Sequence, residues 1–100
     1  MEKVVFGQLF AALTPERRTQ VAAKVNDSRL RLVRLTGDGT LDAHAHDEFA
    51  LVLKGELTVS FSDKAVVLGP SEGVLIPRNT RHNATGRDAQ FVLFEPDPPA

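Results

Sequence analysis

The chain of 100 residues lacks several residue types, and each absence narrows what it can do. It has no cysteine, so disulfide bonds, thiol catalysis and cysteine-based zinc fingers are excluded. It has no tryptophan and no tyrosine, so an aromatic cage or a base-stacking platform would need phenylalanine. The net charge of −1 gives no reason to expect a nucleic acid or an anionic membrane as partner. No apolar run approaches the ~20 residues that span a bilayer.

The remaining composition is that of an ordinary globular chain. Hydrophobic residues make up 42% and charged residues 25%, and the length suits one domain, residues 1–100. The apolar stretch Val4–Leu13 is interrupted by Gly7 and Gln8, so we interpret it as part of the fold rather than as a targeting segment. The expected location is the cytoplasm.

The pattern of turn residues divides the chain into a short helical part and a series of strands. Thr14-Pro15-Glu16 is a good helix start, which predicts a helix from Thr14 to about Lys24 after an extended or irregular entry over 1–13. Beyond a turn at 26–28, short apolar runs separated by turn residues favour a β-sandwich or barrel. The predicted strands cover 30–35, 41–53 with a kink near Asp47, 57–61, 65–68, 73–76 and 90–94, with turns at 55–56, 62–64 and 86–88.

All three histidines of the chain contribute to one candidate site. His44, His46 and Glu48 alternate along the sequence, and on a strand such residues project from the same face. Two imidazoles and a carboxylate are suitable ligands for a divalent metal, and His82 from a distant segment would complete the set. The sequence therefore predicts a metal site formed by His44, His46, Glu48 and His82.

These residues resemble the motifs of the cupins, a family of jelly-roll barrels. The first cupin motif is matched by Gly39, His44, His46, Glu48 and Gly55, with six residues between the glutamate and the last glycine. The second motif is matched at its centre by Pro77 and His82, with Asn79, Ser71 and Gly86 standing in place of other motif residues.

The resemblance covers nearly the whole chain. It is to a subgroup of cupins that has a short N-terminal helix. It implies a mainly β double-stranded β-helix (jelly-roll) barrel over 29–95 and an N-terminal arm and helix over 1–28. The proline-rich tail over 96–100 is expected to be frayed. The resemblance also implies a bound divalent ion (Zn, Ni, Fe or Mn), a small oxygenated ligand and a homodimer.

One departure from the family pattern concerns the ligand spacing. Cupins usually place three or four residues between the second histidine and the glutamate, whereas this chain has only Asp47 there. On a straight strand the Cα atoms of His44 and Glu48 would lie ~13 Å apart, so a bulge or sharp bend is needed. With such a bend Asp47 is an alternative to Glu48, and His46 and His82 are the safer pair.

Several functions stay open at this stage. The chain is either a metal-dependent enzyme, of isomerase or oxygenase type, or a ligand-sensing module whose metal is structural or absent, or a dimeric interaction platform. Fold does not decide among them. Arg78 and Arg81 beside the loop that carries His82 are solvated charges or attract an anionic substrate. Phe49, Leu51 and Leu53, on the face opposite Glu48, fit either a second-sheet core or a dimer interface.

Overall fold

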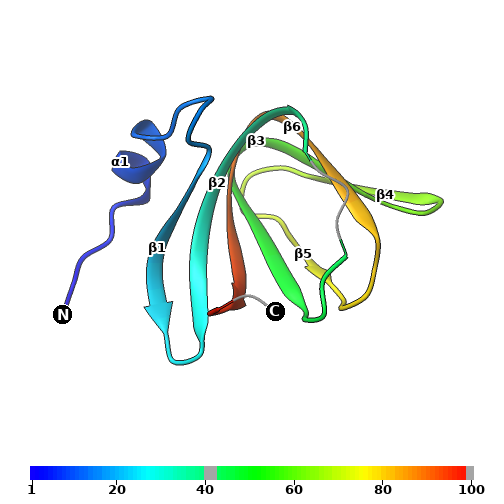
Figure 1. Ribbon diagram of the computed structural model, residues 1–100. Coiled ribbons are helices and arrows are strands. Elements are labelled where there is room, and N and C mark those ends of the chain that lie inside the picture. The colour runs from blue at the N-terminus through cyan, green and yellow to red at the C-terminus, as the bar shows by residue number, and fades with distance from the viewer. Residues whose placement is uncertain (40–42, 99–100) are drawn as a thin grey trace.

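The fold consists of antiparallel strands that curl into a barrel, with one short helix at the N-terminus (Figure 1). A computed structural model describes residues 1–39 and 43–98. The strands pair in the order β1-β2-β6-β3-β4, and β5 pairs with β3. The elements are α1 (Phe6–Ala11), β1 (Thr19–Val25), β2 (Ser28–Asp38), β3 (Glu48–Phe61), β4 (Lys64–Leu68), β5 (Gly73–Ile76) and β6 (His82–Pro96).

The two longest strands, β3 and β6, pair along most of their length and bend at β-bulges in their ladder. The register between them shifts on both sides of Lys54, where Gly55 has φ +78°. A Cβ atom at Gly55 would collide with the carbonyl oxygen of Asp88 on β6. The predicted turns at 55–56 and 86–88 were therefore wrong, because glycine at a bulge lets both strands continue while bending them.

The curved sheet has an apolar cluster on each face. The inner face packs residues such as Val52, Leu57 and Val59, each at most 1% exposed. The outer face of β2 and β6 packs against α1, where Phe10 and Leu32 are almost fully buried. The helix therefore covers part of the outer face of the sheet, while the inner face forms the interior of the barrel.

The N-terminal helix exists, but its predicted position was wrong. The helix lies at Phe6–Ala11, inside the segment expected to be extended or irregular, and much of the predicted helix 14–24 belongs to strand β1. Thr14 and Arg17 exchange backbone hydrogen bonds and form an isolated turn. Pairing of β1 with β2 through the hairpin at Asn26, which has φ 54°, overrides the helix-start signal.

Most other strand predictions were confirmed. The segments 30–35, 57–61 and 65–68 lie within β2, β3 and β4, and the prediction 73–76 coincides with β5. The predicted stretch 41–53 is strand only from Glu48 onward, and its first two residues lie outside the described part, as do 99–100 of the tail. Within residues 1–39 and 43–98, no helix is long and apolar enough to cross a membrane.

Candidate metal centre

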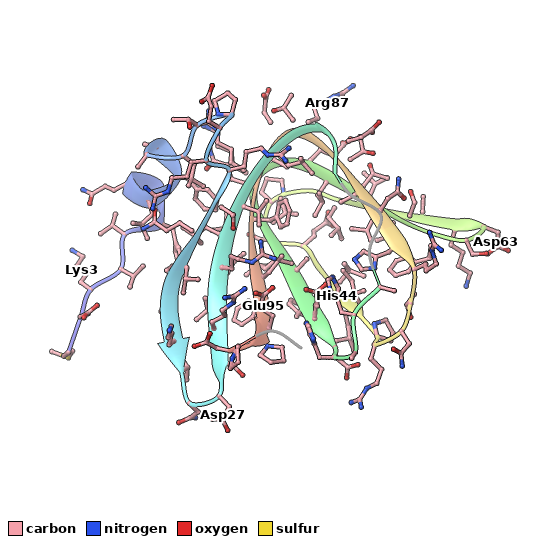
Figure 2. All side chains as sticks on the ribbon, viewed as in Figure 1. Lys3, Asp27, His44, Asp63, Arg87 and Glu95 are labelled. Carbon is pink, nitrogen blue, oxygen red and sulfur yellow. The ribbon has the colours of Figure 1, made fainter. Side chains whose placement is uncertain are left out.

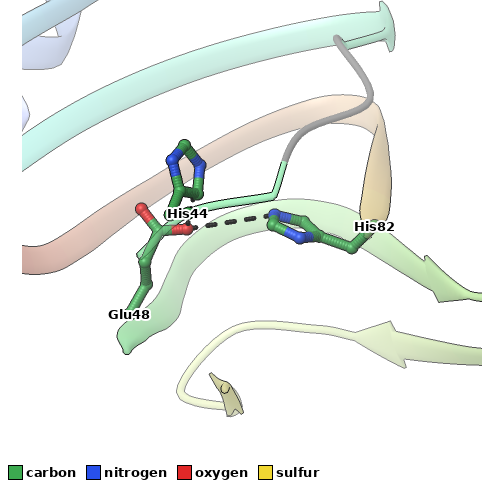
Figure 3. Close-up of side chains that lie close together, drawn as sticks. All are labelled: His44, Glu48 and His82. Carbon is green, nitrogen blue, oxygen red and sulfur yellow. Dashed lines mark ion pairs between the residues drawn. The ribbon is translucent and has the colours of Figure 1, made fainter. Parts of the chain in front are cut away.

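Three side chains from separate segments lie close together (Figure 3). His44 lies in the segment before β3, Glu48 is the first residue of β3, and His82 is the first residue of β6. One nitrogen or oxygen atom of each lies within 4.8 Å of the others. Nε2 of His44 is 3.6 Å and Nε2 of His82 is 3.9 Å from Oε1 of Glu48. Two imidazoles and one carboxylate thus share one small volume.

The chain bends where the sequence spacing required a bend. Residues 43–47 are not part of a strand, and the bend lies at Ala45 and His46. The amide of Asn79 donates to the carbonyl of His44 over 2.6 Å, which ties this segment to the loop before His82. Asn79 itself has φ 59°, the left-handed conformation that asparagine tolerates. The bend allows His44 and Glu48 to approach the same point.

The orientation of His82 leaves its second nitrogen available. Nδ1 of His82 lies 2.9 Å from the carbonyl oxygen of Thr80, which can only accept a hydrogen bond. Nδ1 therefore carries the hydrogen, and the lone pair of Nε2 faces Glu48. His82 is 8% exposed, so bulk water cannot readily pair with this nitrogen.

Glu48 is a buried carboxylate, 5% exposed. Its imidazole contacts of 3.6–3.9 Å are too long for hydrogen bonds. A carboxylate oxygen and an unprotonated imidazole nitrogen both offer electron pairs, so they repel unless a proton or a cation lies between them. A buried charge without a partner is costly. The donor set thus fits a divalent cation at the point where the three side chains meet.

His46 lies beside this group and is not one of the three convergent residues. Its ring stacks on that of His44 with centroids 5.2 Å apart, and its Nε2 is 3.9 Å from Oε2 of Glu48. His46 is 9% exposed, and neither ring nitrogen has a hydrogen-bond partner in the described part of the chain. Unpaired buried nitrogens are rare, and a ligand or an ion beside Glu48 would give Nε2 a partner.

Asp47 is not one of the three convergent residues and binds Arg78 in the facing loop instead. Its carboxylate accepts the backbone N–H of Arg78 over 2.9 Å and lies 3.5 Å from the guanidinium of the same residue. The backbone hydrogen bond and the charge of Arg78 hold the pKa of Asp47 below its ordinary value, against a weaker opposing effect of burial. The structure thus brings Glu48 to the imidazoles of His44 and His82, whereas Asp47 links the segment before β3 to Arg78.

A cavity of about 260 Å³ opens beside the three residues. Its walls are mainly apolar side chains of the inner face, such as Val33, Leu57 and Phe91. Arg18 and Arg31 also line it, whereas neither Arg78 nor Arg81 does. Sequence reasoning missed Arg31, because a strand arginine has no local motif. Its alternation with Val33 and Leu35 is the signal that places it on the inner face.

Comparison with known proteins agrees with the fold and with the motifs. Residues 32–94 match the Cupin domain family. The chain is 42% identical over 91 residues to the uncharacterized protein YdbB of Bacillus subtilis (strain 168). The aligned region covers 76% of this chain and 79% of YdbB.

Solved structures include similar barrels. The crystal structure of a cupin-2 domain containing protein from Shewanella frigidimarina NCIMB 400 has a TM-score of 0.87 and 26% identity, covering 93% of each chain. Hydroquinone 1,2-dioxygenase PnpCD, in complex with Cd²⁺ and 4-hydroxybenzonitrile, has a TM-score of 0.76 and 17% identity, covering 91% of this chain and 70% of that one. At that identity it is similar in fold alone. Because the family match spans more than half of its length, the chain belongs to the Cupin domain family.

Proposed function

We propose that this protein binds a divalent metal ion through His44, Glu48 and His82, with His46 as a further donor. We also propose that it holds a small oxygenated molecule at that ion. The observation that carries the proposal is the convergence of three donor atoms within 4.8 Å beside an apolar cavity. Structural metal sites are typically closed by protein ligands, whereas a site that borders a cavity keeps positions for a small molecule.

The donor set is compatible with zinc, nickel, iron or manganese. Two histidines and one carboxylate with open positions are typical of non-haem iron oxygenases, and the same set also binds zinc. When bound, such an ion polarises a carbonyl group, lowers the pKa of water or, if it is iron, activates oxygen. The residues of the chain orient the donors: Thr80 fixes the ring of His82, and Asn79 holds the backbone of His44.

The size of the cavity limits the ligand. An apolar cavity of about 150 Å³ accepts benzene, and drug-sized ligands occupy ~300–1,000 Å³. The cavity of about 260 Å³ lies between these values. The structure of the fold neighbour PnpCD holds 4-hydroxybenzonitrile, a small aromatic compound with one oxygen donor. An enzyme acting on a small oxygenated molecule is the function that this arrangement supports best.

A ligand-binding module is the second candidate. Among the described residues, the ionisable side chains that line the cavity are Arg18, Arg31 and the three donors His44, Glu48 and His82. General acid–base catalysis needs a group within hydrogen-bond reach of the substrate that is not occupied by the metal. The lack of an additional carboxylate or histidine in this lining favours binding without turnover.

Metal content and turnover test these candidates. Protein purified without an affinity tag or nickel resin is expected to contain about one divalent ion per chain. His82→Ala should lose the ion and remain folded by circular dichroism. Full metal occupancy in His82→Ala would contradict the proposal. Product formation from small oxygenated compounds supports the enzyme, and a raised melting temperature without product supports the binding module.

The proposed homodimer uses the outer face of β3, β5 and β6. Register places Leu75, Phe49 and Phe94 in one row across these strands, and all three are exposed, at 58%, 39% and 40%. The row continues to Leu30, which is partly covered by α1. A second copy of the chain could cover the exposed part with the same row of its own.

Light scattering after size exclusion tests the dimer. Phe49→Ser is expected to raise the dimer dissociation constant at least about tenfold, because it removes an aromatic anchor at the centre of the row. Val67→Ser is the control, since Val67 is equally apolar and 58% exposed but lies on β4. A monomeric wild-type protein, or equal effects of both variants, would rule out this interface.

A further inference from the structure

A cluster of charged residues lies on the inner face of the sheet, outside the candidate metal centre. The carboxylate of Glu95 on β6 accepts hydrogen bonds from Arg31, at 3.1 Å to each oxygen, and from Arg29. Glu95 is 4% exposed. Burial alone would raise its pKa, but the hydrogen bonds and charges of both arginines outweigh burial and hold that pKa below the ordinary value. Arg29 is also paired with the carboxylate of Asp97, 3.9 Å away, so the two guanidinium groups of the cluster are balanced by two carboxylates.

Arg31 is held rigidly and lines the cavity. Its Nε and Nη2 bind Glu95, and its Nη1 donates to the hydroxyl of Thr19 over 3.2 Å. These three bonds use three of the five N–H groups of a guanidinium, so two donors remain. Because the group is already oriented, a ligand that binds it does not need to order a flexible side chain. Arg18, an exposed residue, lines the same cavity.

Strand register places this cluster near the metal centre. Phe49 pairs with Phe94 and Ala50 with Leu93, so the same register brings Glu48 beside Glu95. Glu95 pairs in turn with Arg29 on β2, since β6 lies between β3 and β2. Glu48 and the arginine positions are therefore two strand spacings apart, roughly 10 Å. Figure 2 shows Glu95 and His44 on the same side of the curved sheet.

We propose that Arg31, supported by Arg18, binds the carboxylate of a small ligand whose other end carries an oxygen donor for the metal. This proposal rests on the proposed metal site and names the ligand class. The ligand would be a short carboxylic acid with an apolar middle, because the cavity that the arginines share with the metal ligands is otherwise lined mainly by apolar side chains. A guanidinium binds carboxylates through paired N–H donors. The two guanidinium groups in the cavity lining, those of Arg18 and Arg31, suit a carboxylate.

Glutarate and its uncharged diamide, glutaramide, are matched probes for this subsite. Titration calorimetry on metal-loaded wild-type protein is expected to show glutarate binding at least about tenfold more tightly than glutaramide, because only glutarate carries carboxylates, one for Arg31 and one for the metal. Arg31→Lys keeps a positive charge for Glu95 but loses the planar fork, so it should weaken glutarate binding about tenfold. It should leave glutaramide binding unchanged.

Two further variants keep the test decisive. Arg18→Gln alters an exposed side chain and is expected to weaken glutarate binding while the fold is retained. Arg87→Gln removes an equal charge at a position outside the cavity lining, labelled in Figure 2, and should have no effect. The metal content of every sample is measured first. If both cavity variants hold full metal and bind glutarate as the wild type does, the carboxylate subsite is wrong and the metal site stands. If wild-type protein holds no metal, both proposals are wrong.

Discussion

Oε1 of Glu48 lies 3.6 Å from Nε2 of His44, although the two residues are four positions apart. A straight strand would separate their Cα atoms by ~13 Å, so the contact depends on the bend at 45–46. The bend is stabilised from outside by Asn79 and Arg78, whose amides donate to the 43–47 segment. The candidate site therefore depends on the contact between the 43–47 segment and the loop that carries Arg78 and Asn79.

Glu48→Gln is expected to weaken metal binding at least about a hundredfold, because it removes the only carboxylate of the convergent group, and changes outside the ligand shell already cost 10–100-fold. Without metal, the variant should be at least as stable as the wild type, because it no longer buries an unpaired charge. Metal titration and thermal unfolding with and without metal measure both effects. Glu56→Gln, on the exposed side of β3, is the control. Equal metal affinity of the two variants would contradict the assignment of Glu48.

His46→Phe is expected to preserve the stacked, buried ring while removing two nitrogens that have no partner. The metal-free protein should become more stable by about 1 kcal/mol, since each unsatisfied buried polar group costs ~1–3 kcal/mol. If His46 is a further donor, metal affinity should fall about tenfold as well. Chemical denaturation and metal titration separate the two results, and an unchanged metal affinity would place His46 outside the ligand set.

Glu95→Ala is expected to destabilise the protein by about 3 kcal/mol at neutral pH, because it leaves Arg31 without its carboxylate partner and Arg29 with only the carboxylate of Asp97, 3.9 Å away. The effect should depend on pH with a defined sign. The folded-state pKa of Glu95 lies below the ordinary value of 4.5, so its contribution is complete above that value and disappears as the pH falls through the folded-state pKa.

Urea denaturation of wild type and Glu95→Ala across this range measures that difference. The gap between the two proteins should narrow in acid. Glu16→Ala, at an exposed position before β1, should show no comparable pH-dependent gap. A constant gap from neutral to acidic pH would mean that Glu95 stabilises the fold by packing rather than by charge.

Gly55→Ala is expected to cost about 2–3 kcal/mol. The residue has φ +78°, and its new Cβ would meet the backbone of Asp88 on β6. The matched control is Gly7→Ala in α1, where nothing lies within 4 Å of the added atom and alanine favours the helix. Thermal unfolding should show opposite signs for the two variants. A neutral Gly55→Ala would mean that the facing strands separate easily at this bulge.

Local sequence was sufficient for features that depend on near neighbours. Alternation of Leu57 and Val59 with polar residues predicted a strand with one buried face, and both are 1% exposed. Turn residues at 62–63 and Pro77 after β5 ended strands where expected. The family motifs indicated that the 44–48 segment lies near His82. The structure brings His44 and Glu48 to His82, whereas His46, expected to form the safer pair with His82, is not one of the three convergent residues.

Only the tertiary structure decided the features that depend on distant partners. Thr14 is a favourable first residue for a helix, yet residues 19–25 form a strand that pairs with β2. The hydrogen bonds between these two strands outweigh helix propensities of a few tenths of a kcal/mol per residue. Gly55 suggests a turn in sequence but forms a bulge, because β6 continues alongside it. Arg31 and Glu95 are 64 positions apart, so no local pattern reveals their pairing. Strand register places Glu95 beside Glu48, and Arg31 one strand further away.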